Sequence, residues 1–329
     1  RIRPDTVFES GSVAKQFTAA AVALLCLDGK LSLDDPVRKH VPEVPDFGKP
    51  ILIRHLLNHT SGLRSQWGLM SLAGRPTGLN AHTVDEILEL VARMKELNFE
   101  PGAEYLYCNT GYTLLGVVVA RVSGLSLDAF CQERLFKPLG MTRTQWRDDF
   151  REVVADRATA YGRREDGTFY TNMSFTNVIG NGGLLTTVAD LLAWNENLDD
   201  PKIGGRAFID QLETRGRLND GSEIEYAQGL SVTAYKGVRE VSHGGSTAGY
   251  QTFLARFPEA RLSIAVLSNV TVSGPARLAH EVADIFLAGR LKEPVKPVAV
   301  VVPAETLKKY VDEHELDPLI DRQVQGRQL

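Results

Sequence analysis

Residues 9–27 of the chain read ESGSVAKQFTAAAVALLCL. The alanine- and leucine-rich part predicts a buried helix over residues 13–28, and Gly29 ends it. Ser12 stands at the start of this helix, and Lys15 lies one turn further along the same face. Capping the helix explains a serine at this position but gives no reason for a lysine beside it. The stretch therefore points to chemistry in which the two side chains act together.

The hydroxyl group of a serine is a poor nucleophile unless a base removes its proton and hydrogen-bond donors stabilise the oxyanion that forms. At a helix N-terminus the hydroxyl lies at the positive end of the helix dipole, and a lysine three residues later projects towards the same oxygen. This arrangement suits an acyl-enzyme mechanism. Ser12-Val13-Ala14-Lys15 is the only Ser-x-x-Lys in the chain. About one chance match is expected in a protein of this length, so the motif needs support from other segments.

The second segment is LYCNTGYTLLG, residues 106–116, which ends in a predicted buried helix. Tyr107 and Asn109 are two residues apart in its extended part, so their side chains point the same way. A lysine cation held beside Tyr107 would lower the pKa of the phenol by roughly 1 to 3 units, which makes Tyr107 a candidate base for Ser12. Tyr170-Thr171-Asn172 repeats the pattern inside a predicted hairpin, but the helix-entrance context favours Tyr107.

The third segment is SHGGSTAGY, residues 242–250, in which glycines interrupt two predicted strands. Gly244 and Gly245 allow a substrate backbone to approach a strand edge closely, and the amide of Ser246 is then free to donate to an oxyanion. The amide of Ser12 is the expected second donor. His243 is the titratable group of this segment, and if it assists as a cation, activity falls as the pH rises past its pKa.

These three motifs, in this order, resemble those of the serine β-lactamase and penicillin-binding protein superfamily, in its class C-like branch of esterases and D-amino-acid peptidases. The resemblance covers most of residues 5–290. It implies Ser12 as the nucleophile, Lys15 and Tyr107 as the pair that handles its proton, and Asn109 with residues 243–246 as the substrate-binding edge. It implies no metal and no cofactor. Similar flanking stretches are DTVFESGSVAKQFTA, IRHLLNHTSGL, FEPGAEYLYCNTGYTLLG and GNGGLLTTVADLLAW.

The third motif departs from the superfamily pattern, because His243-Gly244-Gly245 stands where lactamases and transpeptidases have Lys-Thr-Gly. A permanent cation and a hydroxyl that can hold a substrate carboxylate are thereby lost. We therefore expect small esters, amides or short peptides without that carboxylate as substrates. A β-lactamase or DD-peptidase is the alternative enzyme, and a non-catalytic penicillin-binding-like receptor or scaffold is the alternative of another class. Cys108 stands where relatives commonly have serine.

Helical and strand patterns occupy different parts of the chain, which predicts an α+β fold. We expect an antiparallel sheet flanked by helices plus a mainly helical lobe over roughly residues 30–150. Strands are expected from about residue 224 to residue 270, with a helix over 276–289 on the sheet and a hairpin around Asp166-Gly167. Further helices are expected over residues 53–62, 83–96, 111–124, 126–140 and 183–198.

The resemblance implies a β-lactamase-like catalytic domain over residues 1–291, with its site in the crevice between the sheet and the helical lobe. Such domains usually begin with a helix and two strands, which we expect to be missing from this sequence, so that an edge of the sheet needs a partner segment. Residues 292–329 are expected to be a linker followed by the start of a C-terminal extension.

Composition limits the partners. A net charge of -4 and a pI near 6.0 give no general attraction to nucleic acid or to an anionic bilayer, and no stretch approaches the roughly 18 to 20 apolar residues of a membrane span. Three cysteines without metal-site spacing predict free thiols. A small-molecule or peptide partner is therefore favoured. The oligomeric state stays open, and only the resemblance leans towards a periplasmic or secreted protein.

Two other motifs suggest alternative catalytic or metal sites. Gly244-Gly245-Ser246-Thr247-Ala248 nearly matches a nucleophile elbow, with His280 as the later histidine of an α/β-hydrolase, but the alternating β and α units are missing. His55 and His59 are one helical turn apart, as in a zinc pair, but no catalytic glutamate follows His55 directly. A structural role is the better interpretation of these two histidines.

Overall fold

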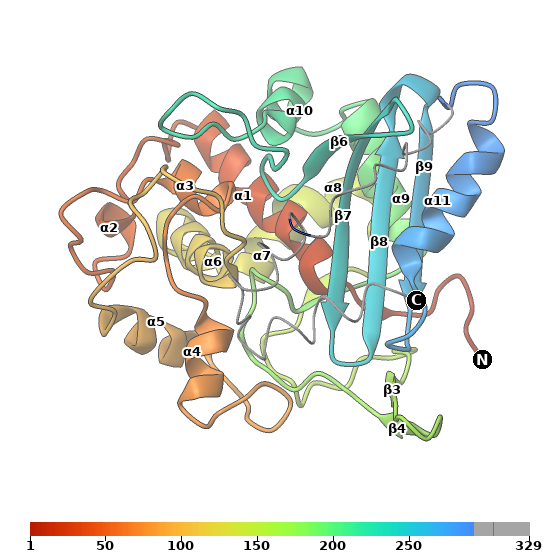
Figure 1. The fold of residues 1–329 in the computed structure, drawn as a ribbon, viewed down its shortest axis with the longest axis horizontal. Coiled ribbons are helices and arrows are strands. Elements are labelled where there is room, and N and C mark those ends of the chain that lie inside the picture. Colours follow the sequence, from red (N-terminus) through yellow and green to blue (C-terminus); the bar gives the residue numbers. More distant parts are fainter. Residues whose placement is uncertain (293–304, 306–329) are drawn as a thin grey trace. The chain divides into compact units, whose positions relative to one another are not determined.

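The computed structural model describes residues 1–292 and residue 305, so the predicted linker and extension lie almost wholly outside the described part. Residues 1–291 form one compact unit. Within this unit the predicted α+β arrangement is confirmed: antiparallel strands are flanked by helices, and a group of helices lies beside the sheet (Figure 1).

The largest sheet has four antiparallel strands in the order β6-β7-β8-β9. They are β6 (Ser231–Tyr235), β7 (Val238–Thr247), β8 (Tyr250–Phe257) and β9 (Leu262–Ser268). The pairing register places Gly245 opposite Thr252 and Ser246 opposite Gln251. A 3₁₀ turn, η3 (Pro258–Ala260), joins β8 to β9. The strands predicted for this part of the chain are confirmed, and β9 is an edge strand among the described residues.

Two smaller sheets accompany the main one. β5 (Leu184–Thr186) pairs antiparallel with both β1 (Phe8–Glu9) and β2 (Gln145–Trp146), and β3 (Tyr161–Arg163) with β4 (Phe169–Thr171) forms the predicted hairpin. The expectation of one helix over residues 183–198 is wrong at its start. Residues 184–186 are a strand because β1 and β2 pair with their backbone groups, and the helix begins only after Thr187, whose hydroxyl accepts a hydrogen bond from the Asp190 amide at 3.2 Å.

The regular elements between residues 37 and 139 are helical. They are α2 (Val37–His40), α3 (Ile53–Leu57), α4 (Gln66–Leu72), α5 (Val84–Ala92), α6 (Asn109–Ser123), α7 (Leu127–Cys131), the π-turn η2 (Gln132–Phe136) and α8 (Lys137–Leu139). The capping box between Thr83 and Glu86 starts α5. The sequence did not predict α2 or α4. None of the described helices is by itself long and apolar enough to cross a bilayer, although residues 109–123 and 127–139, bent by 75°, pass that test as a pair.

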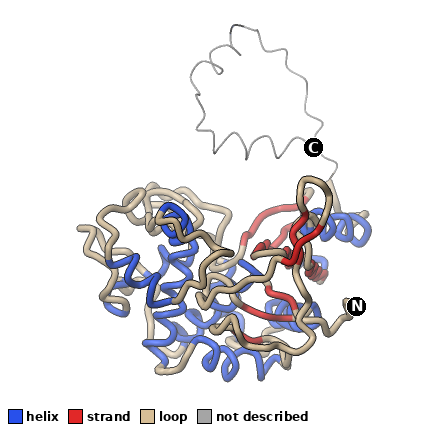
Figure 2. The backbone as a smooth tube through the Cα atoms, turned by 90° about the horizontal axis from the view of Figure 1, so that it is seen from below, coloured by secondary structure: helices blue, strands red, loops and turns tan. Residues whose placement is uncertain are grey.

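Helices cover both faces of the main sheet (Figure 2). Neighbouring residues of a strand point to opposite faces, so Ala255 packs with α11 (Pro275–Phe286), whereas Leu254 belongs to the cluster formed with α1 (Lys15–Leu27). α9 (Val188–Asp199) and α10 (Gly205–Glu213) complete this cluster. Ala279 and Ala283 of α11 are fully buried, which confirms the predicted helix on the sheet.

The turn that leads into α1 lies directly against β7. This turn, η1 (Gly11–Ala14), begins at Gly11 with a φ of +52°. A Cβ atom on Gly11 would lie 2.6 Å from the Ser246 nitrogen, and one on Gly245 would lie 2.1 Å from the Ser10 carbonyl oxygen. Only glycine fits at either position. The close approach fixes Ser12 beside the strand that carries Ser246.

Candidate active site

Lys15 is fully buried at the start of α1, and its Nζ atom has three oxygen neighbours. It lies 3.1 Å from Ser12 Oγ, 2.8 Å from Asn109 Oδ1 and 2.7 Å from the carbonyl oxygen of Asn181. These neighbours come from segments that are 3, 94 and 166 residues away in the chain. The fold therefore brings together Ser12, Lys15 and Asn109, which two separate motifs had indicated.

Burial lowers the pKa of Lys15 well below its ordinary value of 10.5. None of the three neighbouring oxygens carries a formal charge that would keep the ammonium form. A neutral amine has two hydrogens to donate, and Asn109 Oδ1 and the Asn181 carbonyl can accept them. In that neutral form its third neighbour, the Ser12 hydroxyl at 3.1 Å, can donate to the lone pair of the amine. This geometry equips Lys15 to remove the proton of Ser12.

Tyr107 lies next to the same pair, with its ring centroid 4.9 Å from Lys15 Nζ. The expectation that a lysine cation lowers the pKa of Tyr107 is wrong. Although 36% of Tyr107 is exposed, partial desolvation by the surrounding protein raises its pKa, and the contact with the Ser12 hydroxyl opposes this only in part. Tyr107 is therefore a protonated phenol, able to donate a hydrogen bond. The rival Tyr170 packs across the β3–β4 hairpin against Gly162.

His59 holds Tyr107 in place, a role that the sequence did not indicate. The Cys108 amide donates to His59 Nδ1 at 3.1 Å, the Leu106 amide donates to the His59 carbonyl at 2.9 Å, and the His59 and Tyr107 ring centroids are 4.2 Å apart. His59 is buried and has a φ of +60°. Both chain neighbours of Tyr107 are thus bound to one residue. His55 instead accepts a hydrogen bond from its own helix start, at Leu52, and the described residues contain no group of three potential metal ligands.

His243 is buried on β7, and its ring lines a cavity that Ser12 and Tyr107 also line. Its Nε2 atom is 2.9 Å from the Tyr226 hydroxyl, and its Nδ1 atom is 2.6 Å from the Gly244 carbonyl oxygen. Burial and, next, the nearby Lys15 lower the pKa of His243 to about 4. The condition under which His243 would assist as a cation is therefore not met at neutral pH. A carbonyl can only accept, so Nδ1 carries the proton and Nε2 accepts from Tyr226.

The buried histidines His243 and His59 predict that the free energy of unfolding decreases in acid. The folded-state pKa of His243 is lower than the ordinary 6.5, so its contribution to stability is present above pH 6.5 and is lost as the pH falls towards 4. Between pH 7 and pH 5 we expect His243 to lower the free energy of unfolding by on the order of 2 kcal/mol. His59, whose pKa burial lowers well below 6.5, acts in the same direction. Urea unfolding of the unmodified protein and of His243→Asn measures this, and equal pH slopes for both proteins would contradict it.

Glycines on both sides of the contact between η1 and β7 allow two backbone amides to come close together. A Cβ atom on Gly245 would lie 3.1 Å from the Ser12 nitrogen, and one on Gly11 would lie 2.6 Å from the Ser246 nitrogen. The nitrogens of Ser12 and Ser246 therefore both border the contact between η1 and β7. This is the arrangement in which two amides can act on one developing oxyanion.

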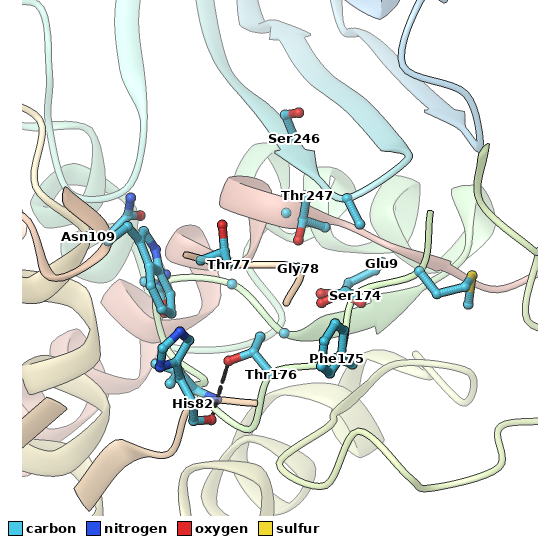
Figure 3. Close-up of a pocket in the computed structure, with 18 of the residues that line it drawn as sticks. Glu9, Thr77, Gly78, His82, Asn109, Ser174, Phe175, Thr176, Ser246 and Thr247 are labelled. Atoms are coloured by element: carbon cyan, nitrogen blue, oxygen red, sulfur yellow. Dashed lines mark hydrogen bonds between the residues drawn. The ribbon is translucent and has the colours of Figure 1, made fainter. Parts of the chain in front are cut away.

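Two cavities meet at this junction, since Ser12 and Ser246 line both. The first, of about 460 Å³, is bordered by Glu9, Asn109 and residues 172–178, and the second, of about 580 Å³, by Tyr107, His243 and the start of α11. Figure 3 shows side chains of the first cavity from distant parts of the chain facing one space. A substrate bound across Ser12 can thus place its two halves in different cavities.

The nucleophile-elbow alternative has no geometric basis. Ser246 lies within the antiparallel strand β7 rather than in a turn between a strand and a helix. His280 stacks on Tyr235 with 4.0 Å between ring centroids, and its Nε2 atom is 2.8 Å from a carboxylate oxygen of Glu240. Ser246 and His280 therefore do not form a catalytic pair.

The chain is similar to known proteins along most of its length. A family model described as Beta-lactamase matches residues 1–288. The chain is 31% identical over 288 residues to "Penicillin-binding protein 4*" of Bacillus subtilis, covering 82% of this chain and 62% of that protein, and 28% identical over 267 residues to a "D-aminopeptidase" of Brucella canis, covering 81% and 50%. The octameric penicillin-binding protein homologue from Pyrococcus abyssi superposes with a TM-score of 0.77 at 30% identity, over 89% of this chain and 68% of that one. The chain thus spans about half to three fifths of the length of these two curated relatives.

Proposed function

The chain belongs to the beta-lactamase family, and from that premise we propose that it is a serine hydrolase that cleaves small esters or amides through an acyl-enzyme, as a carboxylesterase or a D-amino-acid peptidase does. One observation carries the proposal. The Ser12 hydroxyl, which borders two cavities, is 3.1 Å from the nitrogen of a buried lysine whose other two neighbours are acceptors.

The proposed reaction begins when Lys15 takes the proton of Ser12 as Oγ attacks the substrate carbonyl. The oxyanion of the tetrahedral intermediate accepts hydrogen bonds from the amides of Ser12 and Ser246. Tyr107 donates its proton to the leaving group and regains one from Lys15, so that the acyl-enzyme forms with both residues restored. Water then attacks the ester by the reverse proton route, which releases the acid. Asn109 holds Lys15, and His243 supports the wall of the second cavity as a neutral ring.

A second candidate, a β-lactamase or DD-peptidase, has one observation in its favour. Arg277 borders the cavity that also contains residues 243–246, so a cation that could bind a substrate carboxylate is present although the Lys-Thr-Gly motif is not. The guanidinium of Arg277 is already paired with Glu281 on an exposed helix face, which weakens its hold on a substrate. We therefore rank neutral esters and amides first.

A substrate panel tests this ranking. We expect kcat/KM for nitrophenyl acetate or for D-amino-acid amides to exceed that for a chromogenic cephalosporin by about 100-fold or more, because an unpaired substrate carboxylate loses binding. Arg277→Ala should leave the neutral substrates unaffected. A cephalosporin hydrolysed fastest, with a loss in Arg277→Ala, would support the second candidate instead. A non-catalytic receptor would show neither turnover nor covalent labelling by a fluorophosphonate.

His59 gives a prediction about positioning. In His59→Phe the Cys108 amide loses its acceptor, so we expect kcat to fall by about 10- to 100-fold with little change in KM, because a small misplacement of Tyr107 is costly. Asparagine tolerates a positive φ and offers an oxygen acceptor, so His59→Asn should recover most of the rate. Steady-state kinetics of both variants, with their melting temperatures, measure this. A purely structural histidine would lower the melting temperature of both variants and leave kcat of the folded fraction unchanged.

A further inference from the structure

The segment GNGG, residues 180–183, contacts both helices that carry the reactive groups. Its second residue, Asn181, makes the shortest of the three contacts of Lys15 Nζ, 2.7 Å to the backbone carbonyl oxygen. α1 carries Lys15 and α6 carries Asn109, and these two helices lie side by side (Figure 1). In the sequence the segment belongs to the flanking stretch GNGGLLTTVADLLAW, outside the three motifs. The structure thus adds a fourth segment to the surroundings of Lys15.

Two buried threonines hold this segment, one from each helix. The Thr18 hydroxyl donates to the Gly180 carbonyl oxygen at 2.7 Å, and the Thr113 hydroxyl is 3.2 Å from Asn181 Oδ1. Both threonine side chains are buried. A buried carbonyl without a donor is costly, so these hydroxyls restrict where the segment can lie. The peptide units before and after the Asn181 Cα atom are therefore tied to α1 and α6.

The spacing of the threonines along their helices follows the spacing of the site residues. Thr18 stands three residues after Lys15 on α1, and Thr113 stands four residues after Asn109 on α6. Residues three or four apart lie on one helix face. Each helix therefore directs one site residue and one threonine to the same side, where residues 180–183 lie.

The backbone of the segment is confined as well. Gly180 has a φ of +95°, and a Cβ atom on it would lie 2.7 Å from the Tyr112 carbonyl oxygen of α6. Only glycine fits so close to the helix in this conformation. The close approach allows the next residue, Asn181, to reach Lys15 from the side of α6.

We propose that Thr18 and Thr113 are positioning residues of the candidate site: they hold the Asn181 carbonyl against the Lys15 amine. The inference rests on the proposed serine hydrolase activity, in which Lys15 is the base. Neither threonine lines either cavity, so both act through Asn181 and Lys15 rather than on the substrate. An amine that loses one of its two acceptors is free to rotate, and a small misplacement of the base is costly.

Steady-state kinetics of isosteric variants test the proposal. Thr18→Val keeps the shape but loses the hydroxyl, and we expect kcat to fall by about 10- to 100-fold while KM stays within about threefold. Thr18→Ser, which keeps the hydroxyl, should recover most of the rate, and Thr113→Val should lower kcat as well.

Thr186 supplies the matched control. It is buried, it follows the same segment in the chain, and its hydroxyl shares a hydrogen bond with the Thr144 hydroxyl at 2.8 Å. Thr186→Val should therefore keep kcat within about twofold. Equal losses of kcat in Thr18→Val and Thr186→Val, or no loss in Thr18→Val, would overturn the proposal.

The pH profile separates positioning from stability. A carbonyl binds an ammonium group more strongly than an amine, so displacing the Asn181 carbonyl lowers the pKa of Lys15. The acid limb of kcat/KM should then move to lower pH in Thr18→Val. The other titratable side chains around Lys15 are unchanged in this variant: Tyr107, Cys108, Tyr112, His59 and His243. A lower melting temperature, with kcat of the folded fraction unchanged and an acid limb that does not move to lower pH, would show a structural role instead.

A titration of Lys15 by NMR separates this inference from its premise. The Lys15 Cε resonance, assigned with Lys15→Met, follows the pKa of the amine without turnover. A protein that hydrolyses no ester or amide but shows the lowered pKa in Thr18→Val would contradict the proposed function and support the positioning role. The same Lys15 titration in the unmodified protein, Thr18→Val and Thr113→Val would overturn the positioning role.

Discussion

Replacing Ser12 by alanine is expected to lower kcat/KM for the best ester or amide substrate by about 10⁴-fold or more. The reason is that the acyl-enzyme needs the Ser12 oxygen, and the Lys15 amine at 3.1 Å has no other hydroxyl to activate. Two backbone amides beside an empty position can still polarise a carbonyl, but they form no bond to it. Initial-rate kinetics and mass spectrometry of the fluorophosphonate-treated protein measure the loss of turnover and of the covalent adduct.

Ser10 offers a matched control two residues away. Its side chain is buried, and its hydroxyl has no hydrogen-bond partner among the described residues. Ser10→Ala removes the same atom two residues away and should keep the activity within about threefold, because the hydrogen bonds of Ser10 are made by its backbone. Its carbonyl oxygen accepts from the Thr252 hydroxyl and the Val13 amide, and its amide donates to the Leu184 carbonyl. Retained turnover in Ser12→Ala, or equal losses in the two variants, would remove the nucleophile from the proposed mechanism.

Replacing Lys15 has the second-largest expected effect. Lys15→Met keeps the length and the burial but has no basic nitrogen, and we expect a loss of about 10³-fold in kcat/KM, within the range that a general base supplies. Lys15→Arg should fail equally, because a guanidinium stays protonated and cannot accept the proton of Ser12. Binding of an uncleaved substrate amide should change less than turnover, since Lys15 itself lines neither cavity.

The pH profile gives an independent check on the base. Burial lowers the pKa of Lys15, so the reactive amine is lost as the pH falls through that pKa and is present above it. We expect kcat/KM to rise with pH and to reach a plateau. The partial desolvation of Tyr107 raises its pKa, which keeps the proton donor intact across the plateau. A profile that falls through neutral pH would indicate a protonated lysine or histidine as the active form. Full activity of Lys15→Met would eliminate the lysine as base.

The local sequence was sufficient to predict the elements whose conformation depends on nearby residues of the chain. The three-residue spacing of Ser12 and Lys15 fixes both side chains on one helix face, whatever surrounds them. The hairpin around Asp166-Gly167 and the strands between 231 and 268 follow likewise from short patterns, and the structure contains them. The short elements β1, β2 and β5 escaped prediction, because two- and three-residue strands exist only through pairing with distant segments.

The tertiary structure decided the electrostatics of the candidate site. From its spacing Lys15 looked like a cation that activates Tyr107, but its Nζ atom is enclosed by segments 94 and 166 residues away. This burial lowers the pKa of the lysine, and partial desolvation raises the pKa of the Tyr107 phenol. The same holds for His59, whose role depends on which rings and amides reach it. The sequence shows which titratable groups are present and which of them one helix turn brings together. The free energy of charging such a group depends on how much solvent is removed around it, and only the folded chain determines how much solvent is removed.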